Sequence, residues 1–530
     1  MSTLQDRRIT ERWNFLKPTY VKIEQLNDDL FQSMNFSDHG FKIISSKDLP
    51  SGSFINLLII FDDQKQIDLR ARLIWKKTLE ENSVYEFGMM LIKTKNYEEY
   101  KETLSNYSKT SIPERRELER RSFQSETTHE KRAHGRRGIP NIIRRSESTV
   151  RSLDRWASFN TYGRIIESAS ESNLIRNNKH KINLGSNNYL GLTYHPKVKE
   201  AATKAIEKYG AGAGGVRLLS GTMDLHKILE EKLAKFKGTE SCLVVPSGYI
   251  ANIALLTTIG KKGDVLINDR LNHASIIDGC FSTDAKIEFY KHSDMDHLEN
   301  KLKRHEHDRP KLIITDGVFS MDGDVAPLPE ILKLAKQYNA SVVVDDAHAT
   351  GVIGKQGRGT SEHHQVLGKT DIVIATLSKA LGGVGGAICG PSSVIKSIAY
   401  GKYFMFTTAI PPSICASVIA GLDVINNEPQ LIQNLHKNRI SISNQLKKMG
   451  YQVMNSESAI VPIVIGDEIT TYKLTMLLED MNVFVSSVSR PAVPRKLARI
   501  RLSVMATHTT AEIDEAVHAF EKAGKKLGII

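Results

Sequence analysis

Polar side chains follow several short apolar runs in the second half of the chain, at positions where buried strands would end. Asp345 and His348 follow Ser341-Val-Val-Val in the string DDAHATG, and Lys379 follows the run 371–376 in TLSKALGG. A lysine amine can bind a carbonyl compound as an imine. A carboxylate at the end of a buried strand is costly unless a cation pairs with it. These residue types and their spacing predict a site for covalent chemistry at the strand ends.

The same region supplies further groups that such a site needs. Ser247-Gly-Tyr-Ile-Ala-Asn opens a predicted helix, whose first N–H groups can bind a phosphate. His273 offers a flat ring in LNHAS, and Thr376 offers a hydroxyl near the lysine. Pyridoxal phosphate (PLP) is a cofactor that requires a lysine, a carboxylate for its ring nitrogen, a donor for its phenolic oxygen, a phosphate cup and a cover for its ring.

Taken one at a time, these residues have ordinary explanations. A lysine after a strand is usually a surface residue, and a lone histidine is usually structural. Asp346 and His348 also stay open as metal ligands, although no further cluster of ligands is obvious in the sequence. The cofactor hypothesis therefore depends on all of these residues occurring together.

Residues 151–530 alternate helical patterns with short continuous apolar strands, such as Lys311-Leu-Ile-Ile-Thr and Asp371-Ile-Val-Ile-Ala-Thr. Such runs between helices predict an α/β fold with a mostly parallel sheet covered on both faces. Open sheets of this class bind ligands at the carboxyl ends of their strands. From about residue 440 helices and strands mix, which predicts a smaller C-terminal α+β lobe.

From about residue 155 to residue 530 the chain resembles the α-oxoamine synthase family of fold-type I PLP enzymes. That family includes 2-amino-3-ketobutyrate CoA ligase (glycine C-acetyltransferase), 8-amino-7-oxononanoate synthase, 5-aminolevulinate synthase and serine palmitoyltransferase. The matching strings occur in the family's order and are together very specific: SNNYLGL, GAGGVRLLSGTMDLHKILEEKLAKF, PSGYIAN, LNHASIIDG, TDGVFSMDGDVAPLPEI, VVDDAHATGVIGKQGRG, TLSKALGG, FTTAIPPS and ARIRLSV. The resemblance implies a PLP-dependent transferase of that fold type.

The resemblance also implies a role for each residue around the cofactor ring. Lys379 is the imine lysine, and Asp345 pairs with the pyridine nitrogen. His348 and Ser320 contact the phenolic oxygen, and His273 stacks on the ring. Lys379, Asp345 and His273 then form the catalytic group.

On the phosphate side, Gly248 and Tyr249 match the turn beside the phosphate, and Thr376 matches a hydroxyl that binds it. Thr407 and Thr408 resemble the segment that reaches the phosphate of the neighbouring subunit. The resemblance therefore implies an obligate homodimer.

On the substrate side, Arg501 matches the arginine that binds the amino-acid carboxylate, for which a planar guanidinium is suited. Asn187 resembles a substrate-side residue, although Asn188 follows it where many relatives have Asp. Arg164 is a weaker match to an N-terminal substrate arginine.

The implied reaction joins a small amino acid to an acyl-CoA or acyl-carrier thioester, with Lys379 removing the α-proton. Glycine with acetyl-CoA and alanine with a pimeloyl thioester are the leading pairs, and serine with a long acyl thioester stays open. An aminotransferase reaction on the same fold is less favoured, because the contexts DDAHATG and ARIRLSV resemble the oxoamine synthases.

Residues 1–108 have a different, β-rich pattern. Strands such as 53–61, 67–75 and 85–92 alternate with turns, which predicts a small β-barrel or sandwich, and a polar helix at about 96–107 would close it. Two motifs lie in this region: RxxxR at Arg8 and Arg12, and [D/N]xSxxG at Asn35, Ser37 and Gly40.

With LRARLIWKK and YEFGMML, these motifs resemble the PilZ domain, which implies binding of cyclic di-GMP and regulation of the enzyme by this nucleotide through the linker. Guanidinium groups pair with phosphates and stack on guanines. A second RxxxR at 116–120 has no partner motif downstream. Two alternatives stay open: a degenerate domain used for docking or dimer contacts, and a cyclic di-GMP receptor whose synthase domain is a catalytically inactive scaffold.

Residues 109–150 are dense in Arg, Glu, Ser and Thr and have few apolar side chains, which predicts a flexible linker. Residues 113–152 contain 11 Lys or Arg and 6 Asp or Glu, an excess of 5 out of the chain's formal charge of +12. Nearly half of the net charge lies in this connector. The positive charge of the whole chain is therefore weak support for nucleic-acid binding. Contact of the linker with anionic lipid, RNA or a nucleotide phosphate stays open.

The cysteines stand far apart and form no CxxC pair, so neither a disulfide framework nor a zinc site is indicated. The N-terminal residues lack the apolar core of a signal peptide. No run of about 18 apolar residues is long enough to span a membrane. We expect a cytoplasmic enzyme without a bound metal.

Overall fold

The computed structural model describes residues 163–490, 492–494 and 496–530 completely, and between residues 12 and 92 it describes the backbone of eight strands. Contacts divide the chain into two units, Met1–Asn141 and Ile142–Ile530. Arg8, the predicted helix at 96–107 and the predicted linker at 109–150 lie outside the described residues.

The strands of the first unit form one antiparallel sheet in the order β1-β4-β5-β8-β7-β6-β2-β3. The predicted strands at 53–61, 67–75 and 85–92 are present in its backbone. Among the described strands no ladder joins β1 to β3, so closure into a barrel stays a prediction. The bounds are β1 (Arg12–Trp13), β2 (Tyr20–Ile23), β3 (Leu30–Gln32), β4 (Asn35–Ser37), β5 (Gly40–Ser45), β6 (Phe54–Ile60), β7 (Gln66–Glu80) and β8 (Val84–Ile92).

The second unit is built on a seven-stranded sheet in the order β11-β17-β16-β15-β14-β12-β13. Only β17 runs against its neighbours, and the predicted mostly parallel sheet is confirmed. The bounds are β11 (Ser241–Val245), β12 (Val265–Asp269), β13 (Lys286–Tyr290), β14 (Lys311–Asp316), β15 (Ser341–Asp345), β16 (Ile372–Thr376) and β17 (Gly386–Gly390).

Both faces of this sheet are covered, which explains why its strands are apolar without alternation. Ile314 packs in a cluster with α5, α6 and α10, whereas its neighbour Ile313 packs in a second cluster with α7 and α8. The bounds are η3 (Leu192–Tyr194), α3 (Pro196–Tyr209), α4 (Asp224–Lys237), α5 (Gly248–Ile259), α6 (Ala274–Phe281), α7 (Met295–Leu302), α8 (Leu328–Gln337), α9 (Thr360–His363), α10 (Ser392–Ala399), α11 (Lys402–Met405) and α12 (Pro412–Asn427).

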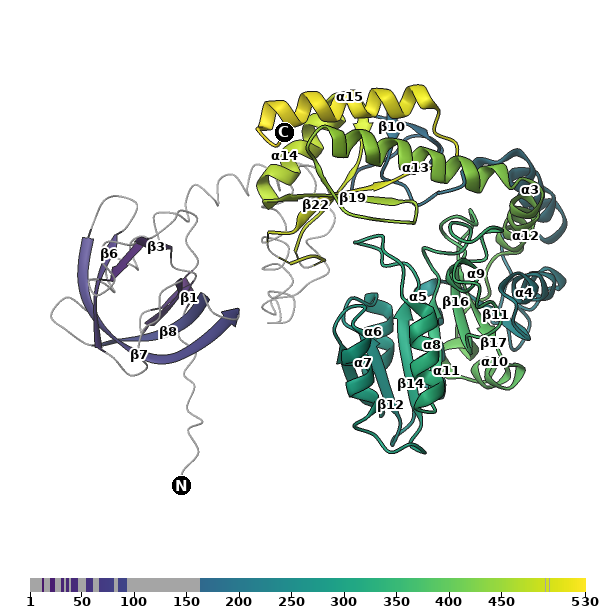
Figure 1. Cartoon of the computed structure of the whole chain (residues 1–530), viewed down its shortest axis with the longest axis horizontal. Helices are drawn as coiled ribbons and strands as arrows, with labels where there is room; N and C mark the ends of the chain where they lie inside the picture. Colours follow the sequence, from purple (N-terminus) through teal and green to yellow (C-terminus); the bar gives the residue numbers. More distant parts are fainter. Residues whose placement is uncertain are drawn as a thin grey trace, which may run out of the picture. The chain divides into compact units, whose positions relative to one another are not determined.

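The C-terminal lobe contains an antiparallel sheet in the order β18-β19-β22-β21, and Figure 1 shows α13 and α15 side by side on it. A three-stranded sheet, β20-β10-β9, joins residues 173–183 to this lobe. The prediction that the lobe begins near residue 440 therefore left out residues 173–183, which also belong to it. The bounds are β9 (Asn173–Arg176), β10 (Lys179–Asn183), α13 (Gln430–Lys448), β18 (Gln452–Val453), β19 (Ile460–Gly466), α14 (Glu468–Asp480), β20 (Val483–Phe484), β21 (Ser486–Val488), β22 (Ala498–Ser503) and α15 (Thr510–Leu527).

Candidate active site

Two carboxylates end adjacent parallel strands of the large sheet. Asp316 closes β14, Asp345 closes β15, and the two are paired in register. Both side chains are buried, and burial raises the pKa of each; the charge of Asp345 raises that of Asp316 further. Asp345 accepts hydrogen bonds from Asn252 Nδ2 at 2.7 Å and from the Ala347 N–H at 3.0 Å. The strand ends thus form an edge with two buried carboxyl groups, whose charged forms a cationic partner would stabilise.

Lys379 lies in the loop after β16, within the field of these carboxylates. Its side chain is half-buried. Burial and the charge of Arg501 lower its pKa from the ordinary 10.5 to about 8, although Asp345 and Asp316 act in the opposite direction. A substantial fraction of the amine is therefore neutral near physiological pH, as a nucleophile or general base requires.

The N-terminus of α5 is the predicted phosphate turn. The Ser247 hydroxyl caps the helix by accepting from the Ile250 N–H at 3.1 Å. Within the described part of the chain, no hydrogen bond of the Gly248 or Tyr249 N–H is recorded, so both donors are available for an anion. A Cβ on Gly248 would lie 3.2 Å from Thr376 Oγ1, so glycine brings the helix start close to the predicted phosphate hydroxyl.

His273 caps α6 and presents an exposed ring beside this turn. Its Nδ1 bonds to Ser275 Oγ at 2.7 Å, and its backbone N–H donates to Asp316 Oδ2 at 3.1 Å. Its ring meets that of Tyr249 edge-on, with centroids 6.3 Å apart. Burial of the imidazole and the charge of Lys379 lower its pKa despite Asp345, which favours a neutral ring suited to stacking.

Arg501 sits on β22 and is buried in a polar network. Its Nε donates to the Ser320 carbonyl at 2.5 Å, its Nη1 donates to Asn187 Oδ1 at 3.2 Å and to Ser503 Oγ at 2.9 Å, and its Nη2 reaches Tyr189 Oη at 3.3 Å. The predicted substrate residues Arg501 and Asn187 are thus brought together. Ser320, predicted for the phenolic oxygen, lies beside them.

Tyr189 joins the substrate side to the cofactor side. Its fully buried hydroxyl lies 2.8 Å from His348 Nδ1 and donates to Asn187 Oδ1 at 3.0 Å. Burial lowers the pKa of His348 well below its usual value, and the charges of Lys379 and Arg501 act in the same direction. His348 is therefore neutral, so one of its ring nitrogens is a hydrogen-bond donor and the other is an acceptor.

Three predicted residues make contacts with groups outside this cluster. Arg164 pairs with Glu479 at 2.8 Å, donates to the Val485 carbonyl and lies over the Phe484 ring. The Thr407 hydroxyl donates to the Tyr403 carbonyl. Thr408 bridges to Val216 in an antiparallel pair. The predicted roles of these three residues stay predictions.

Three members of the site were missed from the sequence: Asn252, Tyr189 and Asp316. Asn252 lies one helical turn after Gly248, so its helical spacing in PSGYIAN was a usable signal. Tyr189 stands in SNNYLGL directly after Asn187 and Asn188. Asp316 ends a buried strand just as Asp345 does. Asn252 and Asp316 therefore had a positional signal, whereas Tyr189 had none that separated it from an ordinary buried polar residue.

The alternative of a metal at Asp346 and His348 has no support in the contacts. Asp346 pairs instead with the buried Lys237 ammonium at 2.9 Å. In the described ranges, no group of three or more His, Cys, Asp or Glu side chains is placed to hold a metal ion. None of the helices described there is long and apolar enough to cross a membrane.

Comparison with known proteins identifies the larger unit. The family model for aminotransferase class I and II matches residues 179–520. The chain belongs to that family. It is 46% identical over 368 residues to an 8-amino-7-oxononanoate synthase of Thermoanaerobacter pseudethanolicus, which covers 69% of this chain and 93% of the relative.

Solved structures agree with this family membership. A serine palmitoyltransferase (SPT) with its PLP internal aldimine matches with a TM-score of 0.71 and 31% identity, over 74% of this chain and all of that one. An 8-amino-7-oxononanoate synthase from Francisella tularensis matches with a TM-score of 0.58 and 26% identity, over 66% of this chain and 99% of that one. Its likeness to these acyl-transferring relatives shows that the protein is a PLP-dependent C-acyltransferase, so the inactive-scaffold alternative loses its support.

The residues at the strand edge fit PLP. The paired donors of Gly248 and Tyr249 suit a phosphate, the Asp345 carboxylate suits a protonated ring nitrogen, and the amine of Lys379 suits covalent attachment. The exposed face of His273 is available to a flat ring. No residue of this donor set is unsuited to the cofactor.

The pKa of Lys379 predicts how the PLP-free protein takes up its cofactor. Covalent attachment requires the neutral amine, so the loading rate should rise about tenfold per pH unit below pH 8 and level off above it. Stopped-flow absorbance across pH 6 to 10 measures this rate. Nα-acetyl-lysine, whose amine has an ordinary pKa, serves as the control for titration of PLP itself. If the loading rate of the protein kept rising up to pH 10 as steeply as the rate of Nα-acetyl-lysine, this result would contradict the lowered pKa of Lys379.

Proposed function

We propose that the protein condenses alanine with a pimeloyl thioester to give 8-amino-7-oxononanoate, CO2 and the free thiol. The observation that carries this proposal is the 46% identity to a synthase of that name over 93% of its length. The buried guanidinium of Arg501, whose charge acts on the amine of Lys379, supports an amino acid as one substrate.

The product name fixes the atoms that each substrate must supply. Carbons 1 to 7 of the product form a seven-carbon diacid whose far carboxyl has become a ketone, which is a pimeloyl group. Carbons 8 and 9 and the amine are the α-carbon, methyl and nitrogen of alanine. The bond between carbons 7 and 8 forms, the thioester C–S bond breaks, and the alanine carboxylate leaves as CO2.

Each polar group of the site has a task in this reaction. PLP, when bound, supplies a ring that accepts the electron pair of the substrate α-carbon. Arg501 binds the substrate carboxylate through its guanidinium. Lys379 takes the α-proton on Nζ as a general base, for which its lowered pKa is suited. The buried Asp345 carboxylate stabilises positive charge on its partner, and His348 donates a hydrogen bond while neutral.

The test is a substrate matrix with the PLP-loaded protein. Alanine, glycine and serine are each combined with pimeloyl, acetyl and palmitoyl thioesters, and release of thiol and CO2 is measured. We expect kcat/KM to be highest for alanine with the pimeloyl thioester. A preference for serine with palmitoyl would instead support the activity named for the structural relatives of TM-score 0.71, and would overturn the proposal.

A second proposal concerns the N-terminal unit: we propose that it binds cyclic di-GMP. The backbone register supports this, because Arg12 on β1 pairs with Ser37 on β4, and Ser37 pairs with Gly40 on β5. The two motifs thus lie on neighbouring strands. Calorimetry on the full chain should show binding that Arg12→Ala abolishes. Arg116→Ala, in the unpartnered RxxxR copy, is the matched control, and absence of binding to the wild type removes the proposal.

We also propose that the enzyme is a homodimer through the face that carries Thr408. Thr408 forms an isolated antiparallel bridge with Val216, and a large exposed apolar side chain lies near each in the chain: Leu219, three residues after Val216, is 83% exposed, and Phe406, two residues before Thr408, is 80% exposed. Exposed apolar groups gathered in this way are typical of an interface. Sedimentation should give a dimer for the wild type and a monomer for Phe406→Glu; a monomeric wild type would contradict the proposal.

A further inference from the structure

A short hairpin connects the large sheet to the arginine of the substrate site. Residues 317–326 leave the end of β14 and fold back, with Val318 bridged to Val325 and the Phe319 N–H donating to the Asp324 carbonyl at 3.0 Å. Its turn includes Gly323 at φ +74°, where a Cβ would lie 2.6 Å from Ser456 Oγ. Glycine is therefore required at the tip, both for its backbone angle and for close contact with the C-terminal lobe.

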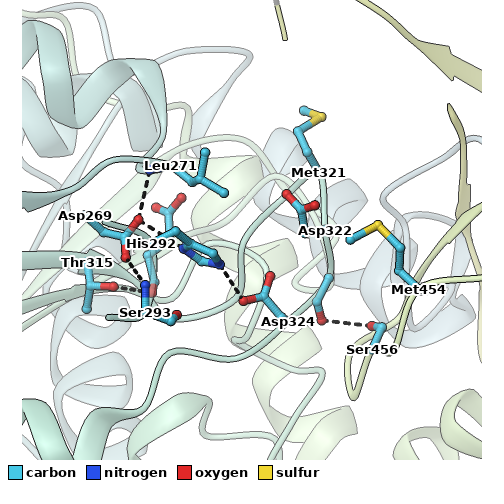
Figure 2. A network of polar contacts seen from close by, with 12 residues as sticks. Asp269, Leu271, His292, Ser293, Thr315, Met321, Asp322, Asp324, Met454 and Ser456 are labelled. Atoms are coloured by element: carbon cyan, nitrogen blue, oxygen red, sulfur yellow. Dashed lines mark hydrogen bonds and ion pairs between the residues drawn. The ribbon is translucent and has the colours of Figure 1, made fainter. Parts of the chain in front are cut away.

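His292 links Asp324, in the second arm of this hairpin, to Asp269 of the large sheet. Figure 2 shows the imidazole between two carboxylates, with Nδ1 at 3.1 Å from Asp269 Oδ1 and Nε2 at 2.9 Å from Asp324 Oδ2. Asp269 is the last residue of β12 and is also held by the N–H groups of Leu271 and Ser293. The ring lies edge-on to the buried Phe319, with centroids 4.4 Å apart. Both ring nitrogens are engaged, so the orientation of His292 is fixed.

The tip of the same hairpin holds the two arginines of β22. Arg499 Nη1 binds Asp322 Oδ1 at 2.7 Å and the Met321 carbonyl at 3.1 Å, and Arg501 Nε donates to the Ser320 carbonyl at 2.5 Å. These arginines are two residues apart, so they lie on one face of the strand. The Gly323 carbonyl also accepts from Ser456 Oγ at 2.8 Å. The hairpin thus joins the large sheet to the lobe, and its Ser320 carbonyl contacts Arg501 directly.

We propose that His292 is a positioning residue for substrate binding: by joining Asp269 to Asp324 it fixes the hairpin, and the hairpin's Ser320 carbonyl sets the orientation in which Arg501 meets the substrate carboxylate. His292 itself touches neither Arg501 nor Lys379 in the recorded contacts. The inference rests on the proposed role of Arg501 and extends it to residues outside the site.

The charge state of His292 supports a firm link. Burial lowers the pKa of the imidazole, but the hydrogen bonds and charges of Asp269 and Asp324 outweigh it and raise the pKa to about 10. The ring is therefore cationic at the pH of any ordinary assay and forms two charge-assisted hydrogen bonds. Such bonds are roughly twice as strong as neutral ones, and a neutral glutamine in this place could not replace both.

A small shift of the hairpin is sufficient to affect binding. Displacement of a positioning group by about 1 Å can cost up to about 10²-fold in an enzymatic reaction. Four hydrogen bonds orient the Arg501 guanidinium, and movement of the Ser320 carbonyl weakens the one made by Nε. We expect the affinity for an amino acid to fall. The affinity for an amine without a carboxylate, which depends on the site around Lys379, should stay the same.

The experiment measures equilibrium binding to the PLP-loaded full chain, without acyl thioester, from the change in visible absorbance. Two ligands are compared: alanine, and ethylamine, which is alanine without its carboxylate. We expect His292→Gln to raise the Kd of alanine about tenfold and to leave that of ethylamine within twofold. His307→Gln is the matched control, because His307 is exposed and its recorded partner is its neighbour Asp308.

A double variant tests the route through the hairpin. If His292 acts through Asp324, then Asp324→Asn and the His292→Gln/Asp324→Asn pair should raise the Kd of alanine by the same factor as His292→Gln alone. Additive effects overturn this route. An unchanged alanine Kd in His292→Gln, or equal losses for alanine and ethylamine, overturns the proposal.

Failure of the proposed function gives a different result. If the wild type binds no alanine, the alanine assignment fails, and the comparison is made with the amino acid that does bind: glycine against methylamine, or serine against ethanolamine. The carboxylate-selective loss in His292→Gln is expected in either case, because Arg501 binds the group that all three amino acids share.

Discussion

Replacing Lys379 by alanine is expected to reduce turnover by on the order of 10⁴-fold or more. This amine is half-buried beside Asp345 and Asp316, and its pKa of about 8 suits both covalent attachment to PLP and removal of the α-proton. Removing it eliminates both tasks at once. The measurements are thiol release with alanine and pimeloyl thioester, and the intact mass after borohydride reduction.

The reduced wild type should carry the mass of one PLP, and the reduced Lys379→Ala protein should carry none. Lys369→Ala is the matched control, because Lys369 is an exposed lysine ten residues before Lys379. It should retain both the added mass and the activity. Wild-type turnover in Lys379→Ala, or PLP fixed to that variant by borohydride, would contradict the assignment.

Replacing Arg501 by lysine is expected to raise the KM for alanine by about 30- to 100-fold while leaving the KM for the acyl thioester near its wild-type value. A charged, bidentate hydrogen-bonding partner for a carboxylate contributes about 2–3 kcal/mol, and lysine keeps the charge but loses the planar fork. Lysine also leaves the acceptors Ser320 O and Asn187 Oδ1 without the donors that Arg501 gives them.

Steady-state kinetics with each substrate varied in turn measures this effect. Arg304→Lys, at an exposed arginine, is the control and should behave as the wild type. If Arg501→Lys changes the thioester KM and not the alanine KM, then Arg501 does not bind the amino-acid carboxylate. Equal changes in both would indicate damage to the fold in place of loss of one contact.

The sequence was sufficient for the residues at the ends of consecutive strands. Asp345 and Thr376 each end a short apolar run, and Lys379 follows one closely. Parallel strands place their carboxyl ends at one edge, so the gathering of these residues follows from the strand pattern alone. The register pair of Asp316 and Asp345 confirms that edge.

The contacts of the arginines could not be predicted in the same way. Arg164 and Arg501 were both predicted to bind substrate, yet the recorded contacts place Arg164 on Glu479 and Arg501 among Asn187, Tyr189 and Ser320. Glu479 lies 315 residues from Arg164 in the chain. Nothing local in the sequence pairs residues over such a separation, because the pairing depends on how the lobe closes on the sheet.

What the sequence determined by itself was the chemistry: the strings around Lys379, Asp345 and His273 carry the groups that PLP needs, in an order typical of the family. What only the tertiary structure decided was how those groups are held. The His292 link, the Tyr189 hydroxyl between His348 and Arg501, and the joining of residues 173–183 to the C-terminal lobe all depend on contacts between distant segments. Local propensity and periodicity do not encode such contacts, since they arise from packing after the elements have formed.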